Sequence, residues 1–295
     1  MGCMNASPSD HDTRERIAVT GATGALGGRV AQLLADRGMP LRLLVRDADR
    51  APDLPDCEVA VAPYGDGSAV AAALEGIDTV LMVSGGEDED RLAQHRTFID
   101  AAAQAGVGHI VYTSFAGASP HAVFTYGRTH HATEQHLLAS GVAHTVLRNN
   151  FYADILPLFV VDGAIRGPAG QGRVAAVSRE DIAEAAVTVL LDPAAYAGEC
   201  FDLTGPAALA LEEVAERLTA LGHDASYVDE PLEDAYAWRR ESGEPDWKVE
   251  GWVSTYTAIA AGEVAAVGTG VRALTGHRAR TLEEAIEGRS PAEAD

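Results

Sequence analysis

Short apolar runs alternate with longer alanine-rich stretches through the first half of the chain. The short runs predict buried strands, and the longer stretches, with apolar residues three and four positions apart, predict helices. Strands are predicted at residues 17–19, 41–45, 58–62, 79–83, 109–113 and 143–147. Helices are predicted at residues 28–37, 68–75, 89–105 and 129–140. This alternation predicts an α/β fold, a Rossmann-type doubly wound parallel sheet with helices on both faces.

The pattern becomes less regular after residue 150. Strands are predicted at 174–178 and 200–204, and helices at 180–191 and 211–221. Residues 225–287 hold all three tryptophans, Trp238, Trp247 and Trp252. We interpret this stretch as part of a small α/β subdomain that covers the substrate, and we expect at least two tryptophans to pack in a core.

Composition and pattern together divide the chain into four segments. Residues 1–15 and 288–295 are polar and predict disordered tails. Residues 16–150 are predicted to form an NADP-binding Rossmann domain. Residues 151–287 are predicted to form the substrate-binding subdomain, with some of their strands returning to the core sheet.

Three glycines, Gly21, Gly24 and Gly27, follow the first predicted strand with G-x-x-G-x-x-G spacing, and a helical pattern follows them. The first glycine allows a sharp turn, the second lets the backbone approach a pyrophosphate, and the third lets the helix pack against the strand. Free N–H groups at the helix start and the helix dipole favour phosphate. The motif therefore predicts a dinucleotide-binding site.

Right-handed crossovers bring the carboxyl ends of all parallel strands to one edge of the sheet, where ligands bind. The residues that follow the predicted strands should therefore line one crevice. These residues are Thr20, Gly21, Arg46, Tyr64, Gly65, Asp66, Ser84, Gly85, Gly86, Thr113, Ser114, Phe115, Asn149 and Asn150.

The residue after the second predicted strand indicates which dinucleotide binds. In an NAD site an acidic residue at this place takes the ribose 2′-hydroxyl. Here the strand ends in Arg46, whose guanidinium can pair with a 2′-phosphate. We therefore predict NADPH, although the adjacent Asp47 could reach the ribose itself.

Charge and cysteine content exclude several classes of partner. The net charge of −22 argues against nucleic-acid and membrane binding, because both partners are anionic. Three separated cysteines predict neither a disulfide framework nor a metal knuckle, which suits a cytoplasmic protein. The sequence contains no apolar run long enough to span a membrane. The composition is compatible with a homodimer and does not fix the oligomeric state.

The motifs together resemble the NmrA-like branch of the atypical short-chain dehydrogenases/reductases, and most of all the type 2 NAD(P)H:quinone oxidoreductases. The likeness spans residues 16–287. It is carried by Val19-Thr-Gly-Ala-Thr-Gly-Ala-Leu-Gly27, Leu44-Val-Arg-Asp47, Tyr64-Gly-Asp66, Gln94-His-Arg96, Val111-Tyr-Thr-Ser114, Leu147-Arg-Asn149 and Leu274-Thr-Gly-His277.

The resemblance implies a role for each matching position. The phosphate loop is Gly21, Thr23, Gly24, Ala25 and Leu26, and Arg46 contacts the 2′-phosphate. Gly65 and Asp66 lie on the adenine side, whereas Ser84, Gly85, Thr113 and Asn149 lie on the nicotinamide side. Phe115, Phe151 and Tyr152 are expected to surround the substrate.

Short-chain dehydrogenases with a proton relay use Ser, Tyr and Lys, with the last two spaced Y-x-x-x-K. This chain offers Ser114, then Tyr126 and His130, so that histidine replaces lysine. Quinone reductases of the resembling type also place His at this position. Two mechanisms stay open: Tyr126 or His130 protonates the product oxygen, or the protein mainly orients a quinone over the nicotinamide with His130 assisting.

The leading hypothesis is an enzyme that transfers hydride from NADPH to a quinone or similar conjugated carbonyl acceptor. No flavin or metal is expected, because the sequence has one nucleotide motif and no metal-like histidine spacing. A ketone, imine or enoyl reductase of a secondary pathway is a second reading. A third is a sensor that binds NADP(H) without catalysis and regulates a partner protein.

Overall fold

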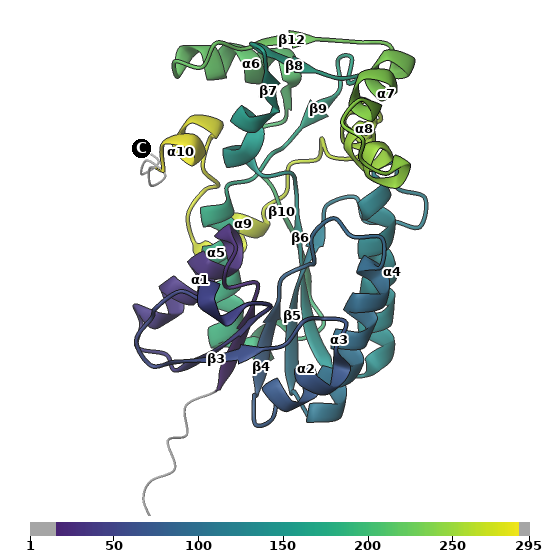
Figure 1. Cartoon of the computed structure of the whole chain (residues 1–295). Helices are drawn as coiled ribbons and strands as arrows, with labels where there is room; N and C mark the ends of the chain where they lie inside the picture. The colour runs from purple at the N-terminus through teal and green to yellow at the C-terminus, as the bar shows by residue number, and fades with distance from the viewer. Residues whose placement is uncertain (1–15, 289–295) are drawn as a thin grey trace, which may run out of the picture.

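The computed structural model describes residues 16–288, and its centre is a seven-stranded parallel sheet (Figure 1). The strand order is β10-β6-β5-β4-β1-β2-β3. The bounds are β1 Ile17–Thr20, β2 Leu41–Val45, β3 Cys57–Val61, β4 Thr79–Met82, β5 His109–Phe115, β6 Ala143–Asn149 and β10 Cys200–Leu203. The predicted doubly wound Rossmann-type sheet is confirmed.

Helices cover both faces of the sheet (Figure 1). One face carries α1 (Ala25–Ala35), α5 (Arg179–Leu191) and α9 (Gly270–Thr275). The other face carries α2 (Gly67–Ala73), α3 (Arg91–Ala105) and α4 (Thr125–Ser140). Along each central strand the side chains point alternately into the two cores, since successive strand residues face opposite sides of the sheet. For this reason β1, β4 and β5 are buried along their whole length.

The C-terminal part forms a smaller layer at the carboxyl edge of the sheet (Figure 1). Its strands are β7 (Val160–Val161), β8 (Ala164–Arg166), β9 (Arg173–Val174), β11 (Leu209–Ala210) and β12 (Ser226–Val228). Its helices are η2 (Ala153–Phe159), α6 (Leu211–Ala220), α7 (Leu232–Arg240), α8 (Asp246–Ala260) and α10 (Leu282–Glu287). Two further short helices are η1 (Ala48–Arg50) and η3 (Pro193–Tyr196). Helix α5 and strand β10, which follow residue 150, belong to the large layer.

Some predicted element ends are wrong. Strands β5 and β6 each run two residues beyond the prediction, because polar residues at their ends continue the ladder, with Ser114 opposite Arg148. The strand predicted at 174–178 is reduced to β9, and Val177 forms only an isolated bridge with Tyr152. The predicted tails at 1–15 and 288–295 lie outside the described residues, except Gly288, which ends α10.

The expectation for the tryptophans is also wrong. None of Trp238, Trp247 and Trp252 is buried, and Trp238 is 39% exposed. Trp238 and Trp252 instead line cavities, because the layer around α7 and α8 has only a small core of Ala235, Val249 and Val253.

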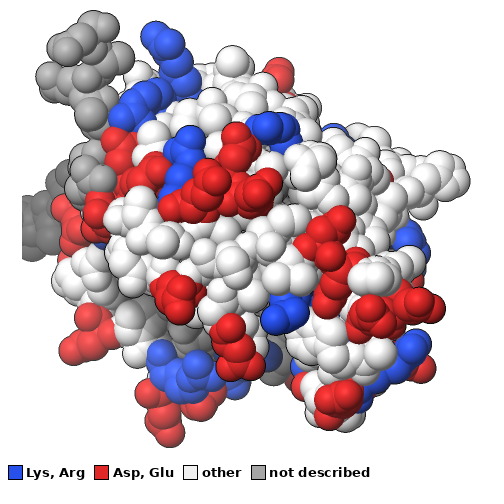
Figure 2. Space-filling model, turned by 90° about the horizontal axis from the view of Figure 1, so that it is seen from above, with Lys and Arg blue, Asp and Glu red and all other residues white. Residues whose placement is uncertain are grey.

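Within residues 16–288 no helix is both long and apolar enough to cross a membrane. Seen from the side of the C-terminal layer, the surface mixes acidic side chains with scattered basic ones (Figure 2). The described cysteines, Cys57 and Cys200, are free and lie on the two edge strands of the sheet.

Candidate active site

The carboxyl ends of β1, β2, β3 and β4 border a cavity of about 440 Å³, here called the cofactor groove. Its walls come from the loops that follow these strands. Of the predicted cofactor residues, the groove is lined by Gly21, Thr23, Gly24, Arg46, Gly65, Ser84 and Gly85. It lies where a parallel sheet of this kind binds a dinucleotide.

The turn between β1 and α1 leaves no room for side chains. Gly21 has a φ of +64°, and a Cβ added at Gly27 would lie 2.4 Å from the Gly21 carbonyl oxygen. Helix α1 starts after Gly24 without a side-chain cap, and its first residues are the exposed Ala25 and the buried Leu26. Uncapped N–H groups at the positive end of a helix suit a phosphate. The turn therefore fits the pyrophosphate of a nicotinamide dinucleotide.

Arg46 and Asp47 differ in whether their side chains are free to bind the adenosine ribose or its 2′-phosphate. Arg46 is exposed at the end of β2 and lines the groove. The Asp47 carboxylate accepts a hydrogen bond from the Asp49 N–H at 3.1 Å and caps η1. The guanidinium is thus placed for a phosphate, while the carboxylate already has a structural partner.

Asp66 does not line the groove. Its carboxylate caps α2 by accepting hydrogen bonds from the Ala69 N–H at 3.0 Å and the Ser68 hydroxyl at 2.7 Å. These bonds, the one from Ala69 first, lower the pKa of Asp66. The side chain shapes the adenine-side loop, and the neighbouring Gly65 provides the groove wall.

Three hydrogen bonds fix the loop after β4. The Ser84 N–H donates to Thr113 Oγ1 at 2.8 Å, and the Gly85 N–H donates to His95 Nε2 at 2.8 Å. The Gly85 carbonyl accepts from Arg91 Nε, also at 2.8 Å. Thr113 supports this loop from within β5. Ser114 and Phe115 also lie inside β5, so the prediction that these three residues follow the strand is wrong.

A second cavity of about 410 Å³, here called the aromatic cavity, adjoins the cofactor groove. The two share Gly85, Gly86 and Glu87. The aromatic cavity is lined by the rings of Phe124, Tyr126, His130, Phe151, Phe159 and Trp252. Flat aromatic walls beside a cofactor groove suit a planar, conjugated acceptor.

Only one of the three predicted substrate residues lines this cavity. Phe151 does so, whereas Phe115 packs behind it with a ring-centroid distance of 4.9 Å. Tyr152 lies outside the lining, and the guanidinium carbon of Arg179 is 6.0 Å from its ring.

A buried arginine, which the sequence analysis did not single out, also lines the aromatic cavity. Arg91 is 4% exposed, and its guanidinium donates to the Gly85 carbonyl, to Thr129 Oγ1 at 2.7 Å and to His130 Nε2 at 2.9 Å. Within residues 16–288 no carboxylate pairs with it, and burial lowers its pKa. A buried cation without a counter-charge is costly, and it stabilises an anion that forms beside it.

The hydrogen bonds of His130 define its protonation. Arginine can only donate, so Nε2 of His130 must accept from Arg91 and the ring proton lies on Nδ1. Nδ1 then donates to the Tyr112 hydroxyl at 2.9 Å. Burial, followed by the Arg91 charge, holds the pKa of His130 well below its usual value. His130 therefore lacks the proton that a general acid needs, and this geometry contradicts the idea that it protonates the product.

Ser114 is directed away from the aromatic cavity. Its hydroxyl donates to Glu134 at 2.6 Å, and Glu134 also pairs with Arg148 at 2.6 Å. Tyr112 and Ser114 stand on the same face of β5 and meet His130 and Glu134, one helical turn apart on α4. The pleat of β5 therefore directs Ser114 towards the Glu134–Arg148 ion pair. The predicted arrangement, with Ser114 beside Tyr126 as a catalytic residue, is not formed.

Among residues 16–288, two buried polar side chains lack a hydrogen bond of normal geometry. Within this range the Tyr126 hydroxyl has no partner, and burial raises the pKa of this phenol to about 12. The side-chain amide of Asn149, at the end of β6, has no such bond to any described residue either, although it lies close enough to Tyr152 to lower the pKa of that phenol. Unsatisfied buried groups are costly, which is expected where a bound molecule completes the hydrogen bonds. Asn149, predicted to lie beside the nicotinamide, is 2% exposed and lines neither the cofactor groove nor the aromatic cavity.

The pKa values predict a flat pH profile. Burial lowers the pKa of His95 to about 3 and holds that of His130 well below its usual value, so both imidazoles are neutral near neutral pH. We expect turnover at saturating cofactor and acceptor to change less than about threefold between about pH 6 and about pH 9. An imidazolium donor of ordinary pKa would instead make the rate fall about tenfold per pH unit above about pH 6.5. Steady-state rates across this range distinguish the two.

One group of metal-type ligands occurs among the described residues, outside both cavities. It comprises Asp181, Glu184 and His277. The Arg280 guanidinium pairs with Asp181 and, at 3.0 Å, with Glu184. This arginine offsets part of the negative charge of the two carboxylates, and His277 Nε2 lies 2.7 Å from Glu184.

Fold and site together define an NAD(P)H-dependent oxidoreductase, and comparisons with known proteins agree. A family described as NAD(P)H-binding matches residues 21–193. Quinone oxidoreductase 2 of Escherichia coli (strain K12) is 32% identical, over 92% of this chain and 97% of that protein. The NAD(P)H azoreductase of Xenophilus azovorans is 31% identical, over 91% of this chain and 96% of that protein.

Solved structures give the same result. The NADPH-dependent quinone oxidoreductase of Escherichia coli, complexed with NADPH, matches with a TM-score of 0.83 and 32% identity, covering 92% of this chain and 99% of that one. A Citrobacter triphenylmethane reductase complexed with NADP(H) matches with a TM-score of 0.81 and 29% identity, over 92% and 99% of the two chains. The chain therefore belongs to the NAD(P)H-binding family.

Proposed function

We propose that this enzyme transfers a hydride from NADPH to a quinone or similar conjugated carbonyl bound in the aromatic cavity. The observation that carries the proposal is the position of that cavity, which shares Gly85, Gly86 and Glu87 with the cofactor groove. An acceptor there is next to the nicotinamide end of a bound dinucleotide. We place the cofactor domain at residues 16–150 and the substrate subdomain at 151–287, with α5, α9 and β10 of the latter segment returning to the central sheet.

Bound NADPH supplies a hydride, that is, two electrons and one proton, and leaves the reduced quinone as a phenolate. In our proposal the Arg91 guanidinium lines the space where this negative charge develops. Its other donors are held by Gly85, Thr129 and His130, so the group is already oriented. Solvent can protonate the stabilised phenolate afterwards, and no general acid is required.

Tyr126 and His130 have supporting roles in this proposal. The Tyr126 phenol, neutral and without a partner, can donate a hydrogen bond to the acceptor's oxygen after a small rotation. His130 fixes Arg91 by accepting its hydrogen bond. Orientation of the acceptor then supplies much of the rate, as expected for a substrate whose reduction gives a stable anion.

A ketone or imine reductase is less well supported, because its alkoxide or amide product needs a proton during the reaction. The usual relay would require Ser114 beside Tyr126, but Ser114 is bound to Glu134. The sensor reading remains as the competing function for a cofactor site of this kind.

The proposed function is tested by mixing the purified protein with NADPH and a panel of quinones, azo dyes and simple ketones. We expect NADPH absorbance to fall with quinones, and only slowly with simple ketones. Tight NADPH binding without oxidation by any acceptor would contradict the proposal and favour the sensor. A preference for ketones over quinones would favour the second enzyme reading.

A further inference from the structure

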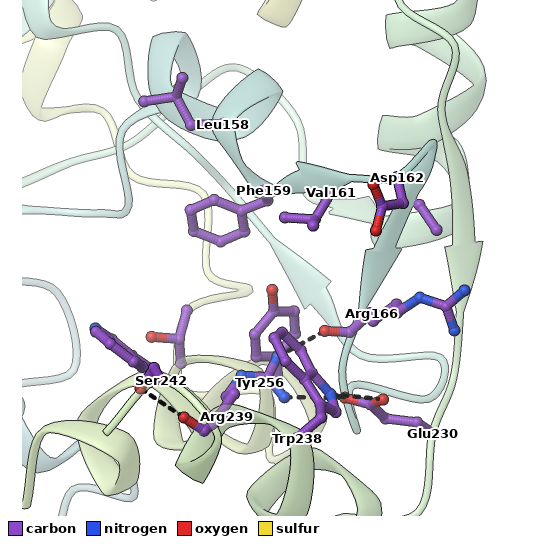
Figure 3. A pocket seen from close by; sticks show the side chains of 13 residues that line it. Leu158, Phe159, Val161, Asp162, Arg166, Glu230, Trp238, Arg239, Ser242 and Tyr256 are labelled. Atoms are coloured by element: carbon purple, nitrogen blue, oxygen red, sulfur yellow. Dashed lines mark hydrogen bonds and ion pairs between the residues drawn. The ribbon is translucent and has the colours of Figure 1, made fainter. Parts of the chain in front are cut away.

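A third cavity, of about 780 Å³, lies in the C-terminal layer and is here called the outer cavity (Figure 3). It is bounded on one side by the end of η2, β7 and β8, and on the other by α7 and α8. Figure 3 shows Phe159 and Val161 projecting from the first side towards Trp238 and Tyr256 on the other. None of the predicted site residues lines it.

The outer cavity gathers exposed apolar side chains. The described part of the chain has nine large apolar residues that are exposed, and three of them line this one cavity. Leu158 is 77% exposed, Val161 53% and Trp238 39%. Apolar surface collected at one concave place indicates a binding site, whereas single exposed apolar residues need no explanation.

The two buried charged side chains in this cavity, Arg239 and Glu230, already have partners, and the exposed Asp162 and Arg166 complete its charged lining. Arg239 lies 4.1 Å from the Trp238 ring centre and 4.9 Å from that of Tyr256, and it donates to Glu230 at 2.9 Å and to the Arg166 carbonyl at 2.7 Å. The Trp238 ring N–H also donates to Glu230. The buried Arg239–Glu230 pair is thus neutral as a whole. The rings of Trp238 and Tyr256, which lie beside Arg239, form the aromatic part of the lining. Such a surface favours a neutral, apolar occupant.

The outer cavity adjoins the aromatic cavity. Both are lined by Phe159, Trp252 and Thr255. The Trp252 ring N–H donates to Glu87 at 3.2 Å, and Glu87 borders both the aromatic cavity and the cofactor groove. The cofactor groove, the aromatic cavity and the outer cavity are therefore neighbours in this order.

We propose that the outer cavity binds an apolar substituent of the acceptor, so that the preferred substrates are quinones with a hydrocarbon side chain. This inference rests on the proposed function for the ring, and adds a subsite that selects the side chain. The ring occupies the aromatic cavity, and the chain passes between Phe159 and Trp252. The 780 Å³ available exceeds the 410 Å³ of the aromatic cavity, so a long substituent can be accommodated.

The kinetic test compares menadione with its derivative that carries a decyl chain on the neighbouring ring carbon. Below the aggregation concentration, we expect the decyl chain to raise kcat/KM by about tenfold to a hundredfold, mainly through KM. Val161→Glu places a charge in the outer cavity and should remove most of this gain. The matched control is Val267→Glu, at a residue 51% exposed that lines none of the three cavities, and it should keep the gain.

A binding test separates the subsite from the reaction. The probe is naphthalene with a decyl chain that ends in bromine, which cannot accept a hydride but quenches nearby tryptophan fluorescence. We expect saturable quenching that falls in Trp238→Phe. Quenching without any quinone reduction would contradict the proposed function and support the subsite. Quinone reduction with equal kcat/KM for both acceptors and no quenching would overturn the subsite.

Discussion

Arg91→Met is expected to reduce quinone turnover by about a hundredfold to a thousandfold. This is the loss seen when one preorganised donor to a developing oxyanion is removed. Arg91 is buried and has no carboxylate partner among residues 16–288, so no described acidic side chain neutralises its charge beside the acceptor. Methionine is similar in length and apolar, and it removes the desolvation cost together with the charge. Steady-state kcat and KM with quinone and NADPH check the prediction.

The control for Arg91→Met is Arg96→Met, an exposed arginine on the same helix, which should keep normal turnover. Arg91→Lys should be intermediate, because lysine keeps a charge but cannot hold Gly85, Thr129 and His130 together. His130→Gln keeps an acceptor for Arg91 and should lose less than Arg91→Met.

A series of quinones distinguishes charge stabilisation from a structural defect. If Arg91 stabilises the phenolate, Arg91→Met should lose most rate with acceptors whose hydroquinones are the weakest acids. A defect that only loosens the loop at Gly85 would lower the rate with every acceptor by the same factor. An equal loss across the series, with an unchanged thermal midpoint, would therefore contradict the proposed role.

The cofactor end of the site could be predicted because its signal is local in the sequence. The glycine turn needs small residues at fixed spacing, and Gly27 has the Gly21 carbonyl 2.4 Å from where a Cβ would be. Arg46 was found for a similar reason, since the residue after the second strand has a defined place in this fold. Geometry of this kind depends on residues that are close in the sequence, so their types and spacing are enough to predict it.

The acceptor end was harder to predict than the cofactor end, because it depends on side-chain directions and on contacts between segments that are distant in the sequence. Ser114 has the right spacing to Tyr126, but the pleat of β5 directs it to Glu134. One signal for Arg91 was present: it is the first residue of α3, where a positive charge opposes the helix dipole. That signal indicates a functional role only once the fold is known, because His130 comes from a different helix.

Arg46→Ala is expected to weaken NADPH binding by about tenfold to a hundredfold while changing NADH binding less than about threefold. Bonds between a guanidinium and a phosphate are charge-assisted and contribute about 1.5–3 kcal/mol. Arg46 lines the cofactor groove at the end of β2, where the 2′-phosphate would lie. Dissociation constants of both dinucleotides, measured by fluorescence titration, check the expected change in preference.

Two neighbouring variants serve as controls for this prediction. Arg50→Ala removes a nearby exposed arginine on η1 that does not line the groove, and it should leave the preference unchanged. Asp47→Ala removes the cap of η1 and should cost stability rather than cofactor affinity, because the carboxylate is bound to the Asp49 N–H. A loss of NADH affinity in Asp47→Ala would show that this carboxylate holds the ribose. Together with an unchanged preference in Arg46→Ala, it would identify the site as one built for NADH.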